Sequence, residues 1–260
     1  CGNSLFSSPA GRIRNNDKIH GARDRHRNVT ATSDHTLYPL RGSDVLPLPQ
    51  DGEGPNHTRF APSPTGYLHI GHAYSALFAY EAARQSGGRF VVRLENIDAQ
   101  RCRNEFEQAT LDDLSWLGLE WEGDVRRQSD HVGLYQEAID ALAGAELIYP
   151  CFCTRRQIRA EVEEASRAPH GPSGELLCRH LTASDRRYRM AHGEPYAWRL
   201  DTTRAMDLAG PLFWYDCRAG WVTARPDLLG DVVVGRKDSP TSYHLSVTLD
   251  DHVQGVTLIT

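Results

Sequence analysis

The sequence predicts an α/β fold built on a parallel sheet, and three observations support this prediction. Short apolar runs alternate with longer segments of helical period between residues 58 and 147. Clusters of Gly and Pro separate these segments, as turns between elements require. The resulting order of strand, helix, strand, helix is typical of right-handed crossovers between parallel strands. Residues 151–190 break this rhythm, so we expect an insertion there.

Each expected element has its own local signal. Strands are short apolar runs bounded by turn residues, and helices carry apolar side chains three or four positions apart. Asn104 and Glu107 have the spacing of a capping pair, so we expect a helix to begin there. The sequence predicts strands at 58–61 and 89–95 and helices at 71–86, 104–117 and 129–147. Further strands are expected at 197–201, 230–234, 244–249 and 255–260.

Composition places the chain among ordinary globular proteins. It has 260 residues, of which 40% are hydrophobic and 24% are charged, with a net charge of −5. This balance excludes a uniformly basic protein that coats nucleic acid, but it is compatible with a local basic groove. No uninterrupted apolar run reaches about eighteen residues, so we expect no membrane contact. The six cysteines follow no apolar signal segment, which favours free thiols and the cytoplasm.

The chain divides into four parts. Residues 1–56 have no sustained period and are rich in polar residues, Pro and Gly. This favours a disordered leader over a nucleic-acid-binding tail or a transit peptide. We expect residues 57–150 to form the first half of an α/β domain, residues 151–190 to form an insertion, and residues 191–260 to form an incomplete second half.

The strongest chemical signal is the string RFAPSPTGYLHIGH at residues 59–72. A strand ends there, a turn follows, and a helix begins at His69-Ile70-Gly71-His72. The free N–H groups and the dipole at a helix start favour phosphate. His69 and His72 fall on the same side of the first turn, and Gly71 leaves room for a nucleotide against the backbone. From the residues alone, a catalytic role and a structural role for the two histidines have equal weight.

A second signal lies in the expected insertion. Cys151-x-Cys153 is followed after 24 residues by Cys178-x-His180. Three thiols and one imidazole in two close pairs suit a closed tetrahedral zinc site. The alternative is that these thiols are buried and bind no metal.

The string at residues 59–72 resembles the HIGH signature of class I aminoacyl-tRNA synthetases, and its full length is similar to the glutamyl branch. The resemblance covers residues 58–260 and includes RLENID, LSWLGLEWEGDVRRQS, YPCFCTR, YAWRLD and SYHLSVTLDDHVQGVT. Other segments, such as APHG and GRKDSPTSYHL, resemble the glutamyl-Q tRNA(Asp) synthetases, a group without an anticodon-binding domain. The resemblance implies a Rossmann-like class I synthetase catalytic fold with a zinc-bearing insertion.

This resemblance implies a ligase that works in two steps. Glutamate would attack the α-phosphate of ATP, which binds with Mg²⁺, and the glutamyl group would then pass to the queuosine base of tRNA(Asp). One alternative is the catalytic domain of an ordinary glutamyl-tRNA synthetase that charges tRNA(Glu). Another is a non-catalytic, zinc-bearing RNA-binding remnant. Val247, where ordinary glutamyl enzymes tend to carry Asn, favours the first reading. We expect a monomer with structural Zn²⁺.

The resemblance also implies roles for individual residues. It makes His69 and His72 catalytic groups that stabilise charge on the α-phosphate, with Gly71 beside them at the ATP site. Taken without it, Arg59 would be a surface arginine and Tyr243 a core aromatic. The positions implied for glutamate are Arg59, Ala61, Pro62, Ser63, Glu95 and Tyr243, and those implied for zinc are Cys151, Cys153, Cys178 and His180.

Two positions depart from the family pattern. Asn96 follows Glu95 where the family has Asp, so an acceptor is kept but a charge is lost. Gly174 stands where the glutamyl-Q group has a tyrosine zinc ligand. The spacing of Cys151, Cys153 and Cys178 with His180 instead resembles some ordinary glutamyl-tRNA synthetases, and it assigns His180 as the fourth ligand.

The family pattern continues after HVQGVT with an arginine that contacts glutamate and a KMSKS-like loop whose lysine meets the ATP phosphates. This sequence ends at Thr260, and Lys237 lacks the flanking residues of that loop. We therefore expect residues 1–260 to be truncated at the C-terminus and to form adenylate weakly or not at all. A pyrophosphate-exchange assay tests this expectation, and a normal exchange rate would contradict it.

Overall fold

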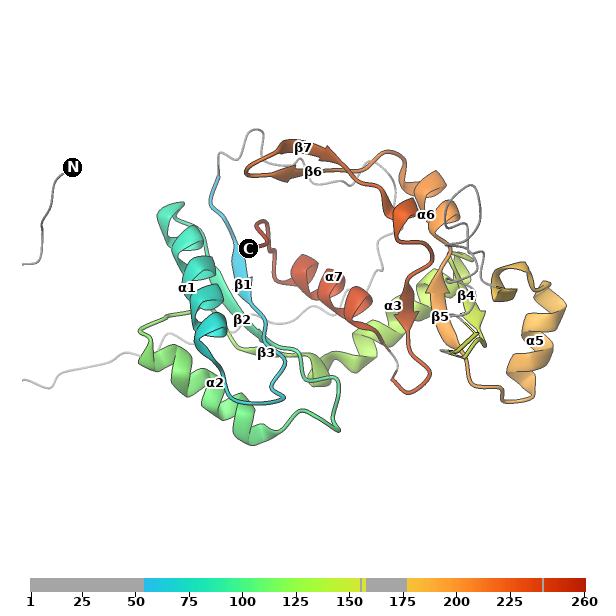
Figure 1. Cartoon of the computed structure of the whole chain (residues 1–260), viewed down its shortest axis with the longest axis horizontal. Helices are drawn as coiled ribbons and strands as arrows, with labels where there is room; N and C mark the ends of the chain where they lie inside the picture. The colour runs from blue at the N-terminus through green and yellow to red at the C-terminus, as the bar shows by residue number, and fades with distance from the viewer. Residues whose placement is uncertain (1–53, 155, 158–176, 240) are drawn as a thin grey trace, which may run out of the picture. The chain divides into compact units, whose positions relative to one another are not determined.

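The computed structural model describes residues 54–154, 156–157, 177–239 and 241–260 (coloured in Figure 1). Most of the expected leader and half of the expected insertion, including Gly174, lie outside these residues. Within the described ranges, no helix is both long enough and apolar enough to cross a bilayer.

The first half of the described chain is a parallel α/β unit (Figure 1). Strands β1 (Thr58–Phe60), β2 (Phe90–Leu94) and β3 (Arg126–Arg127) form a sheet with the order β1-β2-β3, and both strand pairs are parallel. Helices α1 (Ile70–Gln85) and α2 (Asn104–Trp116) provide the crossovers. The predicted parallel α/β arrangement is therefore confirmed.

Small side chains let α1 lie close to this sheet. All five residues of β2 are buried, as expected for a strand covered on both faces. The buried positions of α1 are alanines at helical spacing, Ala76, Ala79 and Ala83, and they pack in a core with Phe60 and Val92. Because alanine extends little from the backbone, the middle and second half of α1 lie close to the sheet.

The second half of the described chain is built on antiparallel strands. A 3₁₀ turn (Gln128–His131) leads into helix α3, which packs against β4 and α7 around Tyr135 and Ile139. One sheet has the order β4-β5-β8, and β6 and β7 form a separate hairpin. The elements are α3 (Val132–Gly144), β4 (Ile148–Cys151), α5 (Ala183–Ala191), β5 (Ala197–Leu200), α6 (Thr202–Ala209), β6 (Phe213–Asp216), β7 (Gly220–Thr223), β8 (Val233–Gly235) and α7 (Tyr243–Val253).

Two predicted strands at the end of the chain are wrong. Residues 244–249 belong to helix α7, because the Ser242 side chain caps it by accepting from Leu245 N and because Leu245, Ser246 and Asp250 are buried at helical spacing. β-branched residues suggested a strand, and a buried acid hid the helical period. Residues 255–260 form no regular element, and Thr257 N and Leu258 N both donate to the carbonyl of His57.

One carboxylate fixes α7 in place. Asp250 is fully buried and accepts hydrogen bonds from Arg126 Nε (2.8 Å), Gln128 Nε2 (2.8 Å) and the Tyr135 hydroxyl (2.9 Å). Burial, followed by the hydrogen bond to Asp250, raises the pKa of Tyr135, so its hydroxyl stays protonated and donates. These bonds tie α7 to β3, to the 3₁₀ turn and to α3, and thereby set the positions of the residues on either side of Asp250.

Candidate active site

A cavity of about 470 Å³ opens between the end of β1 and the start of α1. It collects most of the residues that the sequence predicts for a substrate: Arg59, Ala61, Pro62, Ser63, His72, Glu95 and Tyr243 line it. His69 and Gly71 are not among its lining residues, although both belong to the helix start beside it.

The turn between β1 and α1 is held in shape by the chain that leaves β2. Glu95 N donates to the carbonyl of Pro62 (2.9 Å), and Arg103 N donates to the carbonyl of Pro64 (3.2 Å). Both prolines are buried, and their rings fix the φ angle at these two positions. One wall of the cavity is therefore preorganised by the neighbouring strand.

The two histidines form the cap of α1. His69 Nδ1 accepts from Gly71 N (3.1 Å), and His72 Nδ1 accepts from His69 N (3.2 Å). Their rings stack with centroids 3.9 Å apart and planes 29° apart. Because each Nδ1 accepts a hydrogen bond, the neutral rings carry their protons on Nε2. Burial, and then the nearby His69, lower the pKa of His72, so this ring favours the neutral form.

Gly71 is required by the His69 ring. A Cβ at Gly71 would lie 2.9 Å from His69 Cε1 and 3.1 Å from His69 Nδ1. The sequence predicts that Gly71 leaves room for a nucleotide, but in the structure the ring of His69 takes up the space next to this glycine. Any side chain at position 71 would therefore compete with the ring for the capping position.

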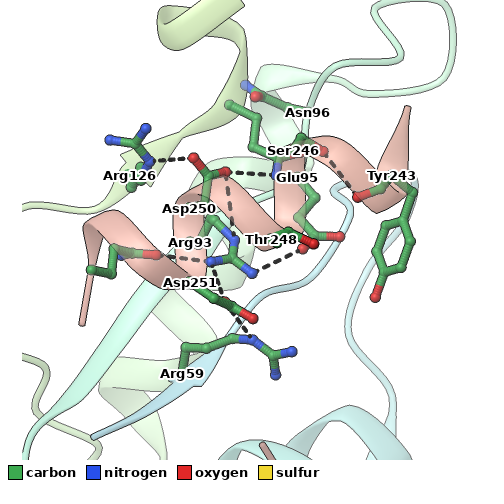
Figure 2. A network of polar contacts seen from close by, with 12 residues as sticks. Arg59, Arg93, Glu95, Asn96, Arg126, Tyr243, Ser246, Thr248, Asp250 and Asp251 are labelled. Atoms are coloured by element: carbon green, nitrogen blue, oxygen red, sulfur yellow. Dashed lines mark hydrogen bonds and ion pairs between the residues drawn. The ribbon is translucent and has the colours of Figure 1, made fainter. Parts of the chain in front are cut away.

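Two charged groups face the cavity from neighbouring strands (Figure 2). Arg59, at the middle of β1, has its Nε on Asp251 Oδ1 at 3.2 Å. The Glu95 side chain follows β2 and is 9% exposed. Burial raises the pKa of Glu95, while Arg93 and Arg59 oppose this shift. The cavity thus presents a guanidinium group and a buried carboxylate that can meet a ligand with both signs of charge.

Tyr243 reaches the cavity from the other half of the described chain. It is the first residue of α7, its side chain is 62% exposed, and it lines the cavity (Figure 2). Tyr243 is therefore not a core aromatic, which was the reading without the family resemblance. Its hydroxyl can offer a hydrogen bond opposite β1.

Asn96 has a local role that a carboxylate could not fill in the same way. Asn96 Nδ2 donates to Glu107 Oε1 (2.6 Å), while Asn96 Oδ1 accepts from Ser129 N (2.8 Å). The substitution of the family's Asp therefore gains a donor as well as losing a charge. Glu107 also accepts from Arg127. The N-cap of α2 is Arg103, whose side chain makes no capping bond, so the predicted capping pair of Asn104 and Glu107 is wrong.

Three thiols lie together at the end of β4. The sulfur atoms of Cys151, Cys153 and Cys178 are buried and lie within 4.8 Å of one another. The sulfurs of Cys153 and Cys178 are 3.2 Å apart, and Phe152 N donates to Cys178 Sγ at 3.3 Å. Three soft donors converging on one point are suited to a thiophilic metal ion.

The protonation of this cluster is uneven. Burial, together with the contact to Cys178, raises the pKa of Cys153 to about 12. Burial acts in the same direction on Cys178, but hydrogen bonds from Cys153 and from the backbone N–H of Phe152 outweigh it and lower the pKa of Cys178. His180 does not belong to the group of converging ligands among the described residues.

Two residues behind the cavity wall, Arg93 and Asp251, were not predicted as part of the site. Arg93 is fully buried in β2, and its Nη1 donates to Asp251 Oδ1 at 2.7 Å. The signals were present, because an arginine inside the apolar run FVVRL and an acidic pair inside an apolar segment both call for buried partners.

Comparison with known proteins identifies the family. The model of the catalytic domain of class I tRNA synthetases (E and Q) matches residues 56–260. The chain belongs to this family. It is accordingly related to aminoacyl-tRNA synthetase ligases, and the expected catalytic fold is confirmed at the level of a class I synthetase domain with a parallel sheet.

Relatives come from two groups of this synthetase family. The chain is 44% identical over 213 residues to a glutamyl-Q tRNA(Asp) synthetase from Rhodobacter capsulatus, an alignment that covers 78% of this chain and 75% of the relative. It is 38% identical over 202 residues to a glutamate–tRNA ligase from Aquifex aeolicus, covering 77% and 41%. A crystal structure of a glutamate tRNA ligase from Elizabethkingia meningosepticum in complex with its amino acid superposes with a TM-score of 0.61, at 26% identity, covering 78% and 42%. The chain thus spans less than half of each of these two ligases.

A glycine-to-alanine substitution tests the geometry of the helix start. We expect Gly71→Ala to displace the His69 ring, remove the bond to Gly71 N, and lower the free energy of unfolding by about 1 kcal/mol, a typical value for a lost cap. Urea denaturation measures this change.

Gly133→Ala is the matched control for this substitution. Gly133 lies in α3, and a Cβ there would meet nothing within 4 Å. Alanine should stabilise a helix interior, so Gly133→Ala is expected to be neutral or stabilising. Equal stability of Gly71→Ala and the wild type would contradict the proposed cap.

Proposed function

We propose that this protein activates glutamate with ATP and transfers the glutamyl group to the queuosine base of tRNA(Asp). The observation that carries the proposal is the convergence of Arg59, Glu95, Tyr243 and His72 on one cavity in a synthetase catalytic domain. The 44% identity to a glutamyl-Q tRNA(Asp) synthetase, over three quarters of that relative, supports the choice of acceptor.

Glutamate would bind by its charges. The terminal nitrogens of Arg59 form a planar fork suited to a carboxylate, and Glu95 is placed to hold the ammonium group. The Tyr243 hydroxyl and the turn at Ala61, Pro62 and Ser63 would supply the remaining contacts. Glutamine lacks the second carboxylate, so a guanidinium group on that side favours glutamate.

The α-phosphate of ATP would lie against the start of α1. His69 and His72 each keep an Nε2–H donor, and the first N–H groups of the helix point the same way as its dipole. Mg²⁺ would accompany the phosphates. No side chain forms a covalent bond to the substrate in this scheme. The rate enhancement therefore comes from positioning and from hydrogen-bond donors aimed at the developing charge.

We also propose that the thiol cluster holds a structural zinc ion. Cys151, Cys153 and Cys178 supply three of the four ligands that a closed zinc site needs. His180 is the fourth ligand that the sequence pattern suggests. Zinc would cross-link residues 151–153 to residues 178–180 within the insertion 151–190. This would support the division into a first half at 57–150, this insertion, and a second half at 191–260.

A second function has its own support. The relatives include glutamate–tRNA ligases at 38% identity, and the chain shares its fold with a solved ligase of this kind. The alternative is therefore the charging of tRNA(Glu) at its acceptor end. Both functions use the same glutamate and ATP sites, so only the acceptor separates them.

Transfer of labelled glutamate decides between the two acceptors. With the full gene product, ATP and Mg²⁺, we expect label on tRNA(Asp) that carries queuosine and none on tRNA(Glu). Unmodified tRNA(Asp) is the matched control, because it differs only in the base that receives the glutamyl group. Labelling of tRNA(Glu) alone would favour the second function and contradict the first.

Metal content tests the thiol cluster. We expect the purified chain to hold about one zinc ion and Cys153→Ser to lose most of it, because removing a thiolate opens a closed site. Elemental analysis by mass spectrometry measures the zinc. Cys217→Ser is the control, since Cys217 is exposed and outside the cluster, and it should keep its zinc. Equal zinc content in the two variants would contradict the assignment.

A further inference from the structure

We propose that Asp251 is a positioning residue for glutamate, which keeps the Arg59 guanidinium aimed at the cavity and away from Glu95. Arg93 anchors Asp251 for this task. The inference rests on the proposed function, in which Arg59 and Glu95 bind the two ends of the same amino acid. Asp251 and Arg93 do not line the cavity, so they would act only through the residues that do.

Arg93 is the fixed point of this arrangement (Figure 2). Its side chain is 0% exposed. Arg93 Nη1 donates to Asp251 Oδ1 (2.7 Å) and to Gln254 Oε1 (3.0 Å), and Arg93 Nη2 lies 3.4 Å from Glu95 Oε1. A planar guanidinium group donates to several acceptors in fixed directions, whereas the donors of a lysine ammonium group rotate freely. Arg93 therefore holds Glu95 and Asp251 at a set separation.

Asp251 in turn restrains the side chain of Arg59. The same oxygen, Asp251 Oδ1, accepts from Arg93 Nη1 and lies 3.2 Å from Arg59 Nε. An arginine held by its Nε keeps the outer end of its fork, with both terminal nitrogens, for another partner. That outer end can then meet a carboxylate with two parallel hydrogen bonds.

The charges explain why this restraint matters. The network contains three guanidinium groups and three carboxylates, so it is balanced without a ligand: Arg59, Arg93, Arg126, Glu95, Asp250 and Asp251. Arg59 is near enough to Glu95 to lower the pKa of that carboxyl group. Without the charge of Asp251, Arg59 is free to pair with Glu95. The two groups that should meet glutamate would then neutralise each other.

Isothermal titration of the full gene product with L-glutamate tests the inference without requiring turnover. The variants are Asp251→Asn, Arg59→Ala and the double variant. Asp227→Asn is the matched control, because Asp227 is also paired with an arginine, but this arginine, Arg225, does not line the cavity. A second titration with a non-hydrolysable ATP analogue shows whether any loss is confined to the amino acid, and thermal unfolding verifies that each variant is folded.

We expect Asp251→Asn to raise the Kd for glutamate about tenfold, the effect of one weakened charge-assisted contact, and to leave the Kd for the ATP analogue within about twofold. Because Asp251 acts through Arg59, the double variant should bind glutamate no more weakly than Arg59→Ala alone. Asp227→Asn should match the wild type. Asp251→Glu, which keeps the charge, should recover part of the affinity and provides a second test if Asp251→Asn is unstable.

The outcomes separate the two proposals. If Arg59→Ala weakens glutamate binding but Asp251→Asn does not, or if the two losses add fully in the double variant, the positioning role is overturned and the proposed glutamate site stands. If Arg59→Ala binds glutamate like the wild type, or if the wild type binds none, the proposed site fails and the inference fails with it.

Discussion

The burial of Arg93 is the constraint on which the rest of the site depends. A guanidinium group without solvent access is tolerated only when carboxylates and other acceptors surround it. Here they come from the residue after β2, from α7 and from the residue that ends α7. The next carboxylate along α7, Asp250, is satisfied by β3, the 3₁₀ turn and α3. Asp251 thus binds Arg93 of β2, while its neighbour Asp250 binds β3, the 3₁₀ turn and α3. Together they join the parallel unit to the helices of the second half.

This junction links fold and function in a small space. Glu95 directly follows the strand that buries Arg93, and the helix that carries Asp251 begins at Tyr243. A shift of α7 would therefore move a cavity residue and the partner of Arg59 together. Such a shared support is a physical reason for a rigid site, because groups that bind a small zwitterion must keep their separation to a fraction of an ångström.

Much of the fold and many of the site positions followed from the sequence, for identifiable reasons. The β1–α1 motif, the apolar β2 and the paired cysteines are local signals, and the structure brings their residues together at the cavity and at the thiol cluster. The roles of these residues remain predictions. α7 was missed because its buried face carries two polar residues, Ser246 and Asp250. The hydrogen-bond partners of Asp250 lie more than a hundred residues away in the sequence. Long-range ion pairs leave no periodic trace, so the sequence indicates that Arg93 and Asp251 need partners but does not indicate that they pair with each other.

The stacked histidines have a consequence for the behaviour of the protein in acid. Each Nδ1 receives a main-chain N–H, so a proton added to that nitrogen would set donor against donor. The lowered pKa of His72 is consistent with this conflict. When His72 takes up a proton in acid, its Nδ1 no longer accepts from His69 N, and the first turn of α1 loses this capping bond. The beginning of this helix is therefore an acid-labile element within an otherwise firmly anchored unit.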